Sequence, residues 1–255
     1  MQEFHELQRH RSHDYRYLMR CWRELTREAG LKMKPLVKVN GIPVYFIASN
    51  AAEKGEGTAV YISAGVHGDE VAAPWGLLAW ARENVALLNG RPFLLFPALN
   101  PHGMILNTRV DHAGRDINRL FHHEEDELIV AWRAVLQGWR FSLGLCLHED
   151  YDGQGCYLYE LTKSRRPVGH DILQDCNAVI PIDMRRSMDG HRANAGLIVR
   201  RRIPEMPGRP EAIVLHEVGT SIALTFETPS EFSLTDRIQA QKAFITSALK
   251  HAPAL

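Results

Sequence analysis

Short apolar runs that alternate with helical patterns are the feature of this chain that most constrains its fold. Residues 59–63 form an apolar run that ends at Ala64-Gly65, a helical pattern covers about residues 70–88, and residues 93–99 form a second apolar run. A strand, a helix and a second strand in this order form a βαβ unit, whose two strands lie parallel in one sheet. This unit predicts an α/β fold.

The remaining patterns extend this unit. We expect helices at about residues 124–137 and 233–249, and buried strands at residues 141–147 and 222–226. Strands that alternate with helices indicate an open, twisted, mostly parallel (mixed) β-sheet with helices on both faces. Because 255 residues fit one such unit, we expect a single domain that covers residues 1–255.

The N-terminal segment has helical periodicity that stops at Gly30. Its apolar residues recur at steps of three and four: Tyr15, Leu18, Met19, Trp22 and Leu25. We therefore expect residues 1–35 to form a helical appendage to the core. The pair Asn40-Gly41, between two β-rich runs, favours the positive φ angles of a two-residue turn and predicts a β-hairpin. Between about residues 150 and 215 the pattern weakens, and we expect loops that form the wall of a cleft.

Composition excludes several classes of function. The chain carries 30 Lys plus Arg against 30 Asp plus Glu, so no basic surface for nucleic acid is indicated. No apolar stretch approaches the roughly 18 residues of a membrane span. The N-terminus lacks the apolar region of a secretory signal, so we expect a cytoplasmic protein that binds neither nucleic acid nor membrane. The four Cys residues form no CxxC pair, which favours buried thiols in a reducing compartment.

A metal site is indicated where the first strand of the βαβ unit ends. The turn Gly65-Val-His67-Gly-Asp-Glu70 places an imidazole and a carboxylate three residues apart, and open α/β sheets bind ligands at the carboxyl ends of their strands. His148 follows another apolar run and supplies a third donor. Two His and one carboxylate leave a fourth position open, which is typical of catalytic Zn²⁺. We predict one Zn²⁺ per chain, bound by His67, Glu70 and His148; Mn²⁺ and Co²⁺ accept the same donors.

Candidate residues for catalysis and substrate binding accompany this metal set. A water activated by Zn²⁺ needs a base to take its proton, and Glu227 at a strand end is placed for that role. The segment 107–119 contains Arg109, Asn118 and Arg119, and Arg binds carboxylates through paired hydrogen bonds. We therefore expect a substrate with a free carboxylate, and Arg109 is the candidate donor to the developing oxyanion.

The order and spacing of these motifs resemble the zinc carboxypeptidase superfamily, which includes carboxypeptidase A and the succinylglutamate desuccinylase and aspartoacylase branch. The motifs lie within residues 58–230: HxxE at 67 and 70, Asn100-Pro-His-Gly103, the Gly-x-Asp-x-Asn-Arg run 114–119, His148 and Phe226-Glu227. HxxE alone is common, so the specificity lies in the combination.

This resemblance implies a zinc carboxypeptidase-like fold and a role for each motif. It implies that the zinc ligands are His67, Glu70 and His148. Glu227 becomes the general base and Arg109 the arginine that polarises the substrate carbonyl. The same resemblance makes Asn118 and Arg119 the clamp on a substrate carboxylate.

The chain also departs from the digestive members of the superfamily, because it is short and shows no signal or propeptide. Three tyrosines are candidates for the mobile tyrosine that closes over a peptide, and the sequence does not choose among them: Tyr151, Tyr157 and Tyr159. A small peptide with a free C-terminus and an N-acyl amino acid both present a carboxylate beside an amide. We expect a metallocarboxypeptidase first, a deacylase of N-acyl amino acids second, and a non-catalytic metal-binding protein of the same fold third.

Two further charged clusters have simpler interpretations. His122-His123 and the acidic residues 124–127 imitate a metal cluster, but the dipole of a helix favours acidic residues at its start. Several arginines either line a pocket for an acidic side chain or form a solvated basic loop: Arg185, Arg186, Arg192 and residues 200–202. The sequence leaves both interpretations of the arginines open.

Overall fold

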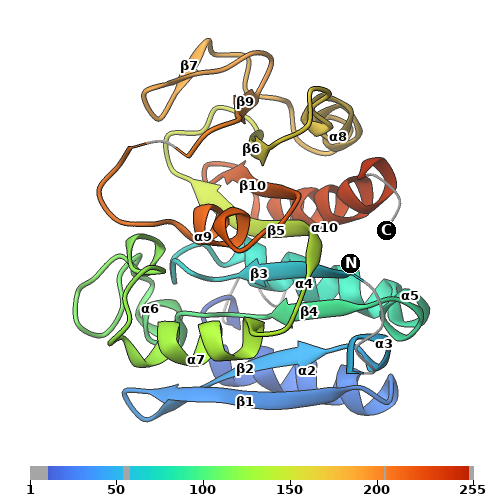
Figure 1. The fold of residues 1–255 in the computed structure, drawn as a ribbon, viewed down its shortest axis with the longest axis vertical. Coiled ribbons are helices and arrows are strands. Elements are labelled where there is room, and N and C mark those ends of the chain that lie inside the picture. The colour runs from blue at the N-terminus through green and yellow to red at the C-terminus, as the bar shows by residue number, and fades with distance from the viewer. Residues whose placement is uncertain (1–10, 54–57, 204, 253–255) are drawn as a thin grey trace.

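An eight-stranded mixed β-sheet forms the centre of the structure, a computed structural model that describes residues 11–53, 58–203 and 205–252 (Figure 1). Named in order across the sheet, the strands are β1 (Lys32–Val39), β2 (Ile42–Ala48), β4 (Phe93–Phe96), β3 (Ala59–Ala64), β5 (Phe141–Asp150), β10 (Ile222–Pro229), β6 (Tyr157–Thr162) and β9 (Leu197–Arg200). A separate short hairpin pairs β7 (Ser187–Met188) with β8 (His191–Arg192).

Helices cover both faces of this sheet (Figure 1). The helices α2 (Tyr15–Glu28), α4 (Ala72–Glu83), α8 (Gly169–Cys176) and α10 (Leu234–His251) contribute to the larger apolar core on one face. On the other face lie α7 (Glu127–Leu136) and α9 (Glu211–Glu217). Shorter turns of helix are α3 (Asn50–Glu53), α5 (Val85–Gly90), α6 (Pro101–Leu106) and the 3₁₀ turn η2 (Ile117–Arg119). These layers confirm the predicted α/β fold.

The central strands are apolar because both of their faces are buried. Along β3, Val60 and Ile62 belong to the core on one side of the sheet, whereas Ala59 and Tyr61 belong to the core on the other side. A strand covered on both sides gives a continuous apolar run in the sequence instead of an alternating one. This property explains why the runs at β3, β4, β5 and β10 could be located from the sequence.

The pairing of the strands decides where their ends meet. The pairs β4/β3, β3/β5, β5/β10 and β6/β9 are parallel, and β1/β2, β2/β4 and β10/β6 are antiparallel. The strands β3, β5 and β10 therefore lie side by side and end at the same edge of the sheet. Because β6 runs in the opposite direction, it starts at that edge and continues the wall next to β10.

The N-terminal helix is part of the main core. Asp14 caps α2 by accepting a hydrogen bond from the Tyr17 N–H, and the buried face of the helix consists of the predicted periodic residues together with Cys21 and Thr26. The prediction of a helical appendage through residue 35 is wrong at its end, because β1 begins at Lys32. Residues 1–10 of that prediction lie outside the described residues.

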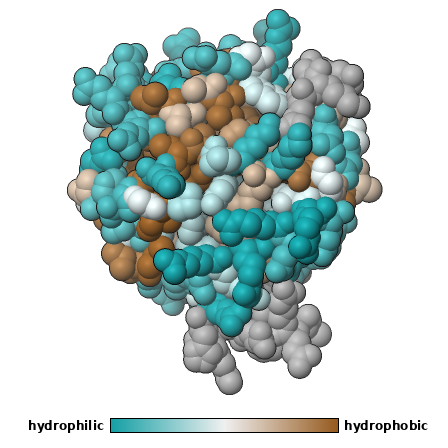
Figure 2. Space-filling view, turned by 90° about the horizontal axis from the view of Figure 1, so that it is seen from below, coloured by the Kyte–Doolittle hydropathy of each residue, from teal (hydrophilic) through white to brown (hydrophobic). Residues whose placement is uncertain are grey.

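The hairpin of β1 and β2 confirms the prediction from Asn40-Gly41, which have φ angles of 47° and 79°. Among the paired strands β1 lies at the edge of the sheet, and it carries Lys32, Lys34 and Lys38. Charged side chains on an edge strand disfavour pairing with another chain. Figure 2 shows the molecule from this side, where hydrophilic side chains are interspersed with apolar ones.

None of the described helices has the length and apolar character needed to cross a bilayer.

The acidic cluster near residue 125 caps a helix. The Asp126 carboxylate accepts hydrogen bonds from the N–H groups of Leu128 and Ile129 at the start of α7, and Glu127 lies in the first turn. Within the described ranges, neither His122 nor His123 belongs to a set of side chains that could hold a metal ion. The structure therefore agrees with the capping interpretation.

Candidate active site

Three neighbouring parallel strands bring the predicted metal and base residues together. His67 and Glu70 follow the end of β3. His148 lies near the end of β5, and the β-sheet register places Glu227 of β10 directly beside it. All four side chains thus project near the carboxyl edge of the sheet, where open α/β folds bind their ligands.

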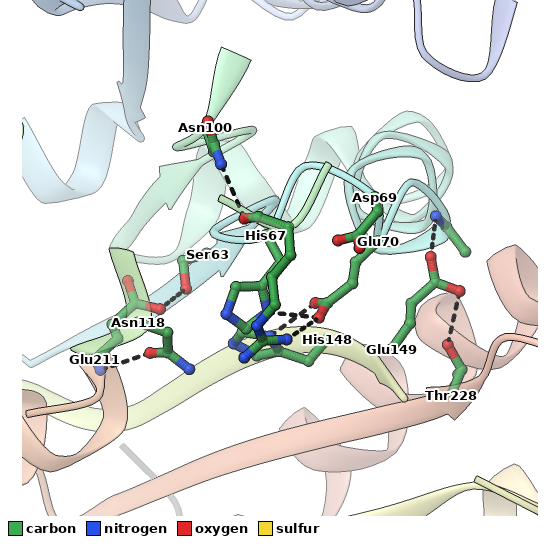
Figure 3. Close-up of polar contacts among 12 residues, drawn as sticks. Ser63, His67, Asp69, Glu70, Asn100, Asn118, His148, Glu149, Glu211 and Thr228 are labelled. Atoms are coloured by element: carbon green, nitrogen blue, oxygen red, sulfur yellow. Dashed lines mark hydrogen bonds and ion pairs between the residues drawn. The ribbon is translucent and has the colours of Figure 1, made fainter. Parts of the chain in front are cut away.

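The side chains of His67, Glu70 and His148 converge on one point (Figure 3). The Nδ1 atom of His67 lies 2.5 Å from Glu70 Oε1, and the Nδ1 atom of His148 lies 2.8 Å from Glu70 Oε2. One ligand atom from each residue lies within 4.8 Å of the others, and all three residues are buried. Within residues 11–53, 58–203 and 205–252, no other three His, Cys, Asp or Glu side chains meet in this way.

This donor set fits a divalent metal ion. The cluster offers two imidazole nitrogens and one carboxylate, and a pocket lies on its open side. Catalytic zinc sites use this set of protein ligands and keep a further position open. The second ring nitrogen of His67 lies 3.2 Å from Asp116 Oδ1. A carboxylate in that position fixes the tautomer and the ring orientation of a histidine ligand. The residues present therefore satisfy both the ligand set and part of its surroundings.

The three residues shift one another's pKa values. Burial alone would raise the pKa of the Glu70 carboxyl, but the neighbouring His67 and His148 lower it to about 2. Burial likewise opposes protonation of His67, whereas Glu70 and Asp116 raise its pKa to about 8. The cluster thus concentrates negative charge from Glu70 and Asp116 around two imidazoles, which favours a cation at this position.

Two glycines let the turn after β3 form this cluster. Gly65 has a φ of +61°, a backbone angle that favours glycine. A Cβ atom on Gly68 would lie 1.9 Å from the carbonyl carbon of Gly103 in α6. The turn that carries His67 and Glu70 is therefore packed backbone to backbone against α6.

Asn100 connects this turn to the loop that carries Arg109. Its backbone N–H donates to the Gly65 carbonyl at 2.7 Å, and its side-chain oxygen caps α6 by accepting from the Gly103 N–H. Its Nδ2 donates to the carbonyl groups of Arg109 and Val110. The Asn-Pro-His-Gly motif thus holds the arginine loop against the candidate metal site.

The Arg109 guanidinium lies next to the three converging side chains. Its Nη1 is 3.6 Å from Glu70 Oε1, and its Nε and Nη2 donate to Asp116 Oδ2 at 3.2 and 3.1 Å. The Arg109 side chain is 45% exposed, so it has room to move toward the pocket. A mobile cation in this place can approach a substrate carbonyl oxygen.

Asn118 is held by a buried carboxyl network behind the site. Its Oδ1 accepts a 3.0 Å hydrogen bond from the Glu211 N–H at the start of α9. The Glu211 carboxyl accepts from the hydroxyl group of Ser63 on β3 (Figure 3). It also accepts from the hydroxyl group of Tyr61 on the same strand. Burial raises the pKa of Glu211, although these hydroxyl donors oppose the change. The Asn118 amide nitrogen is thereby left to face the pocket.

A pocket of about 370 Å³ opens beside the candidate metal site. Its lining includes two of the proposed ligands, Glu227, Arg109, Asn118 and Arg119. Its apolar lining comes from Leu161, Met206, Ala212, Ile213 and Ala223. A volume of this size falls within the range of small-ligand sites. The pocket thus adjoins the metal cluster, the candidate base and the candidate carboxylate clamp.

The three candidate tyrosines have different surroundings. Tyr157 and Tyr159 line the pocket and donate hydrogen bonds to Asp150 and Asp189. Tyr151 is 63% exposed, is not among the pocket residues, and donates to Asp69. The tyrosines at 157 and 159 thus form part of the wall, and Tyr151 lies outside it.

Glu227, the candidate general base, lies in an acidic environment. Burial and the nearby carboxylates of Glu70 and Asp150 raise its pKa, and His148 opposes this change. A carboxyl with a raised pKa takes up a proton near neutral pH more readily than an exposed one. A bound cation would partly reverse the rise, because an opposite charge stabilises the carboxylate.

Sequence reasoning missed two residues that organise the site. Asp116 lies inside the quoted run 114–119, so the motif itself could have indicated it through its contacts with His67 and Arg109. Glu211 lies in a segment of weak periodicity, and no local pattern marks it. Its contacts with Tyr61, Ser63 and Asn118 come from distant parts of the chain.

Comparisons with known proteins agree with this geometry. Residues 56–136 match the family described as the succinylglutamate desuccinylase/aspartoacylase catalytic domain. A comparison with curated protein sequences found no match. A structure from Shewanella amazonensis, assigned to the metallopeptidases, has a TM-score of 0.83 at 24% identity and covers 95% of each chain.

Two further solved structures share the fold at lower identity. A metallo-carboxypeptidase from Burkholderia cenocepacia has a TM-score of 0.68 at 15% identity, covering 91% of this chain and 67% of its own. Carboxypeptidase A from Helicoverpa armigera has a TM-score of 0.66 at 13% identity, covering 90% of this chain and 71% of its own. At these identities the likeness concerns the fold.

Proposed function

We propose that this chain, which has the carboxypeptidase fold, belongs near the succinylglutamate desuccinylase/aspartoacylase branch of the zinc carboxypeptidase superfamily. We propose further that it is a zinc-dependent hydrolase that cleaves an amide bond next to a free carboxylate. The observation that carries this proposal is the pocket in which the His67, Glu70 and His148 cluster, Glu227 and Arg119 meet. Such a pocket can bind a substrate carboxylate at its Arg119 side and place the adjacent amide next to Glu227 and the His67, Glu70 and His148 cluster.

His67, Glu70 and His148 would hold the metal ion. When bound, a zinc ion supplies Lewis acidity: it lowers the pKa of water towards about 7 and polarises a carbonyl. The chain itself supplies the orientation of its ligands, through the Asp116 contact with His67 and the Gln241 hydrogen bond to the His148 carbonyl. Zinc is the proposed ion because its usual catalytic ligands are those present here.

Glu227 would move the proton. Its carboxylate takes a proton from the attacking water and later gives it to the amide nitrogen as the C–N bond breaks, which is general base and then general acid catalysis. Arg109 would turn from Asp116 toward the substrate carbonyl oxygen and donate hydrogen bonds to the negative charge that develops there. One such donor contributes about 3 kcal/mol to transition-state stabilisation in known cases.

Asn118 and Arg119 would bind the free carboxylate of the substrate. The Asn118 amide nitrogen faces the pocket because its oxygen is already occupied by the Glu211 N–H. Arg119 lines the same pocket. Fixing the carboxylate places only the neighbouring amide at the metal site, so exopeptidase action on small peptides is our first choice.

A second candidate function is deacylation of N-acyl amino acids. The family match over residues 56–136 favours it, because that family is named for a desuccinylase and an acylase. An N-acyl amino acid carries the same carboxylate beside an amide, so it would use the same residues. Relative activity on benzoylglycyl amino acids and on N-acetyl and N-succinyl amino acids distinguishes the two.

The substitution Glu227→Gln tests the proposed role of the base. We expect the zinc-loaded wild type to hydrolyse one of these substrate groups, and Glu227→Gln to lose about 10²- to 10⁴-fold in kcat while retaining zinc. The exposed Glu231→Gln is the matched control and should keep full activity. Wild-type hydrolysis that survives Glu227→Gln would contradict the role of Glu227. A zinc-loaded protein without activity on either group would favour a non-catalytic metal-binding protein.

A further inference from the structure

The C-terminal helix α10 contacts the strands of the candidate site from the opposite face of the sheet. The register pairs His148 of β5 with Glu227 of β10. The next pair along the same strands is Glu149 with Thr228. Because successive side chains of a strand point to opposite faces, Glu149 and Thr228 point away from the face of His148. Both contact α10, and Gln241 of that helix is fully buried.

The side chain of Gln241 connects the two strands that carry His148 and Glu227. Its Nε2 donates to the His148 carbonyl oxygen at 2.7 Å and to the Thr228 hydroxyl oxygen at 3.1 Å. One amide nitrogen thus contacts the backbone of a proposed metal ligand and the residue that follows the candidate base. This contact fixes the His148 backbone relative to the end of β10.

His148 lies where its strand has lost one of its two neighbours. The pairing of β5 with β3 ends at Leu147 and Ala64, so β3 offers His148 no partner residue. On the other side, β10 continues to pair with β5 through Asp150. A ligand side chain moves with its backbone, so a hydrogen bond to the His148 carbonyl also limits where the imidazole can lie.

The position of Gln241 is itself restricted by close packing. A Cβ atom on Gly76 of α4 would lie 2.4 Å from the Cβ of Gln241, so the two helices are in close contact at this residue. Three residues further along α10, Phe244 stacks on Phe226 of β10 with ring centroids 4.4 Å apart. The donor group therefore belongs to a helix that is packed tightly against both α4 and the sheet.

A second contact from the same helix reaches the turn that carries Glu70. Arg237 forms an ion pair with the buried carboxylate of Glu149. The same carboxylate accepts a 2.7 Å hydrogen bond from the N–H of Ala72, two residues after Glu70. Its other oxygen lies 3.5 Å from the Thr228 hydroxyl (Figure 3). The ends of β5 and β10 and the turn after β3 thus meet in one buried network at α10.

Stability alone does not explain an amide at position 241. The Oε1 atom of Gln241 is buried, and among the residues that the structure describes it has no hydrogen-bond partner. An unpaired buried polar atom destabilises a fold, whereas an apolar side chain of the same length contains no such atom. The Nε2 contacts with His148 and Thr228 therefore give the amide a role beyond filling the core.

We propose that Gln241 is a positioning residue of the candidate site. Its amide holds the His148 carbonyl and the Thr228 hydroxyl, and so fixes the spacing between the His148 imidazole and the Glu227 carboxylate. Gln241 touches neither the metal nor the substrate and acts only through the two strands. This inference rests on the proposed function, because it concerns the metal ligand and the base assigned there.

The substitution Gln241→Met tests this role, because it keeps the length of the side chain and removes the donor. We expect the affinity for zinc, measured by competition with a chromophoric chelator, to fall about 10- to 100-fold, the usual effect of losing a contact that orients a ligand. With Co²⁺ in place of zinc, the d–d absorption bands should shift, because the imidazole of His148 moves. In the hydrolysis assay kcat should fall while KM stays near the wild-type value, since the proposed carboxylate clamp lies in another segment.

Two further variants separate positioning from folding. Thr228→Val keeps a β-branched side chain and removes the hydroxyl that accepts from Gln241, so zinc affinity should fall by a smaller factor. This variant carries the test if Gln241→Met does not fold. Ile245→Val, a fully buried residue one turn further along α10, is the matched control. It should lower the temperature of unfolding and leave the zinc affinity and the Co²⁺ spectrum unchanged.

Metal binding distinguishes a failure of this inference from a failure of the proposed function. If Gln241→Met and Thr228→Val match Ile245→Val in zinc affinity and in the Co²⁺ spectrum, the role of Gln241 is overturned, even when the wild type hydrolyses its substrates. A loss of zinc affinity in Gln241→Met that Ile245→Val does not share would support the role, even when no substrate is hydrolysed. The absence of hydrolysis would then count against the proposed function alone.

Discussion

At the scale of single residues, Asn118 depends on a carboxyl group that does not itself line the pocket. An amide side chain offers one acceptor and one donor end. The acceptor end of Asn118 is fixed by the Glu211 N–H, and the Glu211 side chain is fixed by two hydroxyl groups of β3. The position of the proposed carboxylate clamp therefore follows from a buried network that joins β3 to α9.

The substitution Glu211→Ala tests this dependence. It leaves the Tyr61 and Ser63 hydroxyl groups without their buried acceptor, so the free energy of unfolding should fall by about 1–3 kcal/mol. Because α9 and Asn118 lose their anchor, KM should rise more than kcat falls. Urea unfolding and steady-state kinetics measure the two effects. Glu217→Ala, a partly exposed residue of the same helix, is the control.

An unchanged KM in a destabilised Glu211→Ala protein would contradict the link to Asn118. The role of Glu211 in stability would remain, but its role in positioning the clamp would not. Glu211→Gln offers a second comparison, because it keeps the shape of the side chain. We expect it to retain most of the wild-type KM.

The meeting of the candidate metal and base residues could be predicted because each follows a recognisable strand. His148 and Glu227 end apolar runs, and HxxE follows a third run, so strand ends alone located these candidates. Arg200, which lines the pocket, and Glu211 could not be located in this way, since their positions depend on the order β10-β6-β9 and on the packing of α9. Contacts between distant segments leave no local pattern.

At the scale of elements, the turn between β3 and α4 depends on its contact with α6. The Cβ of an alanine at Gly68 would meet the backbone of Gly103, which cannot move as a flexible side chain can. His67 and Glu70 flank this glycine. A shift of the turn would therefore separate the proposed ligand atoms.

We expect Gly68→Ala to destabilise the fold by about 1–3 kcal/mol, a typical effect of overpacking. The same change should weaken zinc affinity, because it displaces the turn that carries two proposed ligands. Thermal unfolding with and without added zinc measures both effects. Gly90→Ala is the control, since an added Cβ there meets nothing within 4 Å. A Gly68→Ala protein that matches this control in both measurements would show that the turn tolerates the displacement.

The arginine loop depends on a second carboxylate, Asp111. Its oxygens accept hydrogen bonds from the N–H groups of Ala113 and Arg115 and from the Arg115 guanidinium. Burial alone would raise the pKa of Asp111, but these donors lower it below its ordinary value. The stabilisation is therefore present above the pKa of a free Asp, about 3.9, and is lost as pH falls through the lower pKa of the folded state.

The variant Asp111→Asn tests this pH dependence. At pH 7 we expect it to be less stable than wild type by about 1–3 kcal/mol, because it loses charged hydrogen bonds. The difference should shrink as pH falls from about 5 towards 2, where the wild-type carboxylate also becomes protonated. Urea unfolding at a series of pH values measures the difference. If the stability difference between wild type and Asp111→Asn stays constant down to the lowest pH, the charge of Asp111 is not its cause. The effect would then come from the geometry of the hydrogen bonds.

Some elements escaped prediction for a physical reason. The strand β6 is buried, yet Glu160 interrupts its apolar run. That carboxylate accepts from the N–H groups of Val168 and Gly169 at the start of α8, so a tertiary contact compensates the polar residue. The strand β9 has four residues, which is too short for a periodic signal. The expected loops between residues 150 and 215 therefore contain two strands of the main sheet.

At the scale of the whole molecule, the site lies where the parallel and antiparallel parts of the sheet meet. The parallel strands β3, β5 and β10 supply the candidate metal ligands and the candidate base. The antiparallel strand β6, together with β9, extends the pocket wall away from them. The alternating pattern predicted the first group, whereas the reversal at β6 had no signal in the sequence. The candidate site thus draws on both the parallel and the antiparallel part of one sheet.

Metal content measured by elemental analysis tests the central claim most directly. Wild type and three variants would be loaded with zinc and dialysed. We expect about one zinc per chain in wild type, in Glu227→Gln and in His123→Ala, whose histidine is exposed on the surface. His148→Ala should lose the ion, because it removes one of the three converging donors. Wild-type protein that takes up no zinc, or full zinc content in His148→Ala, would contradict the account.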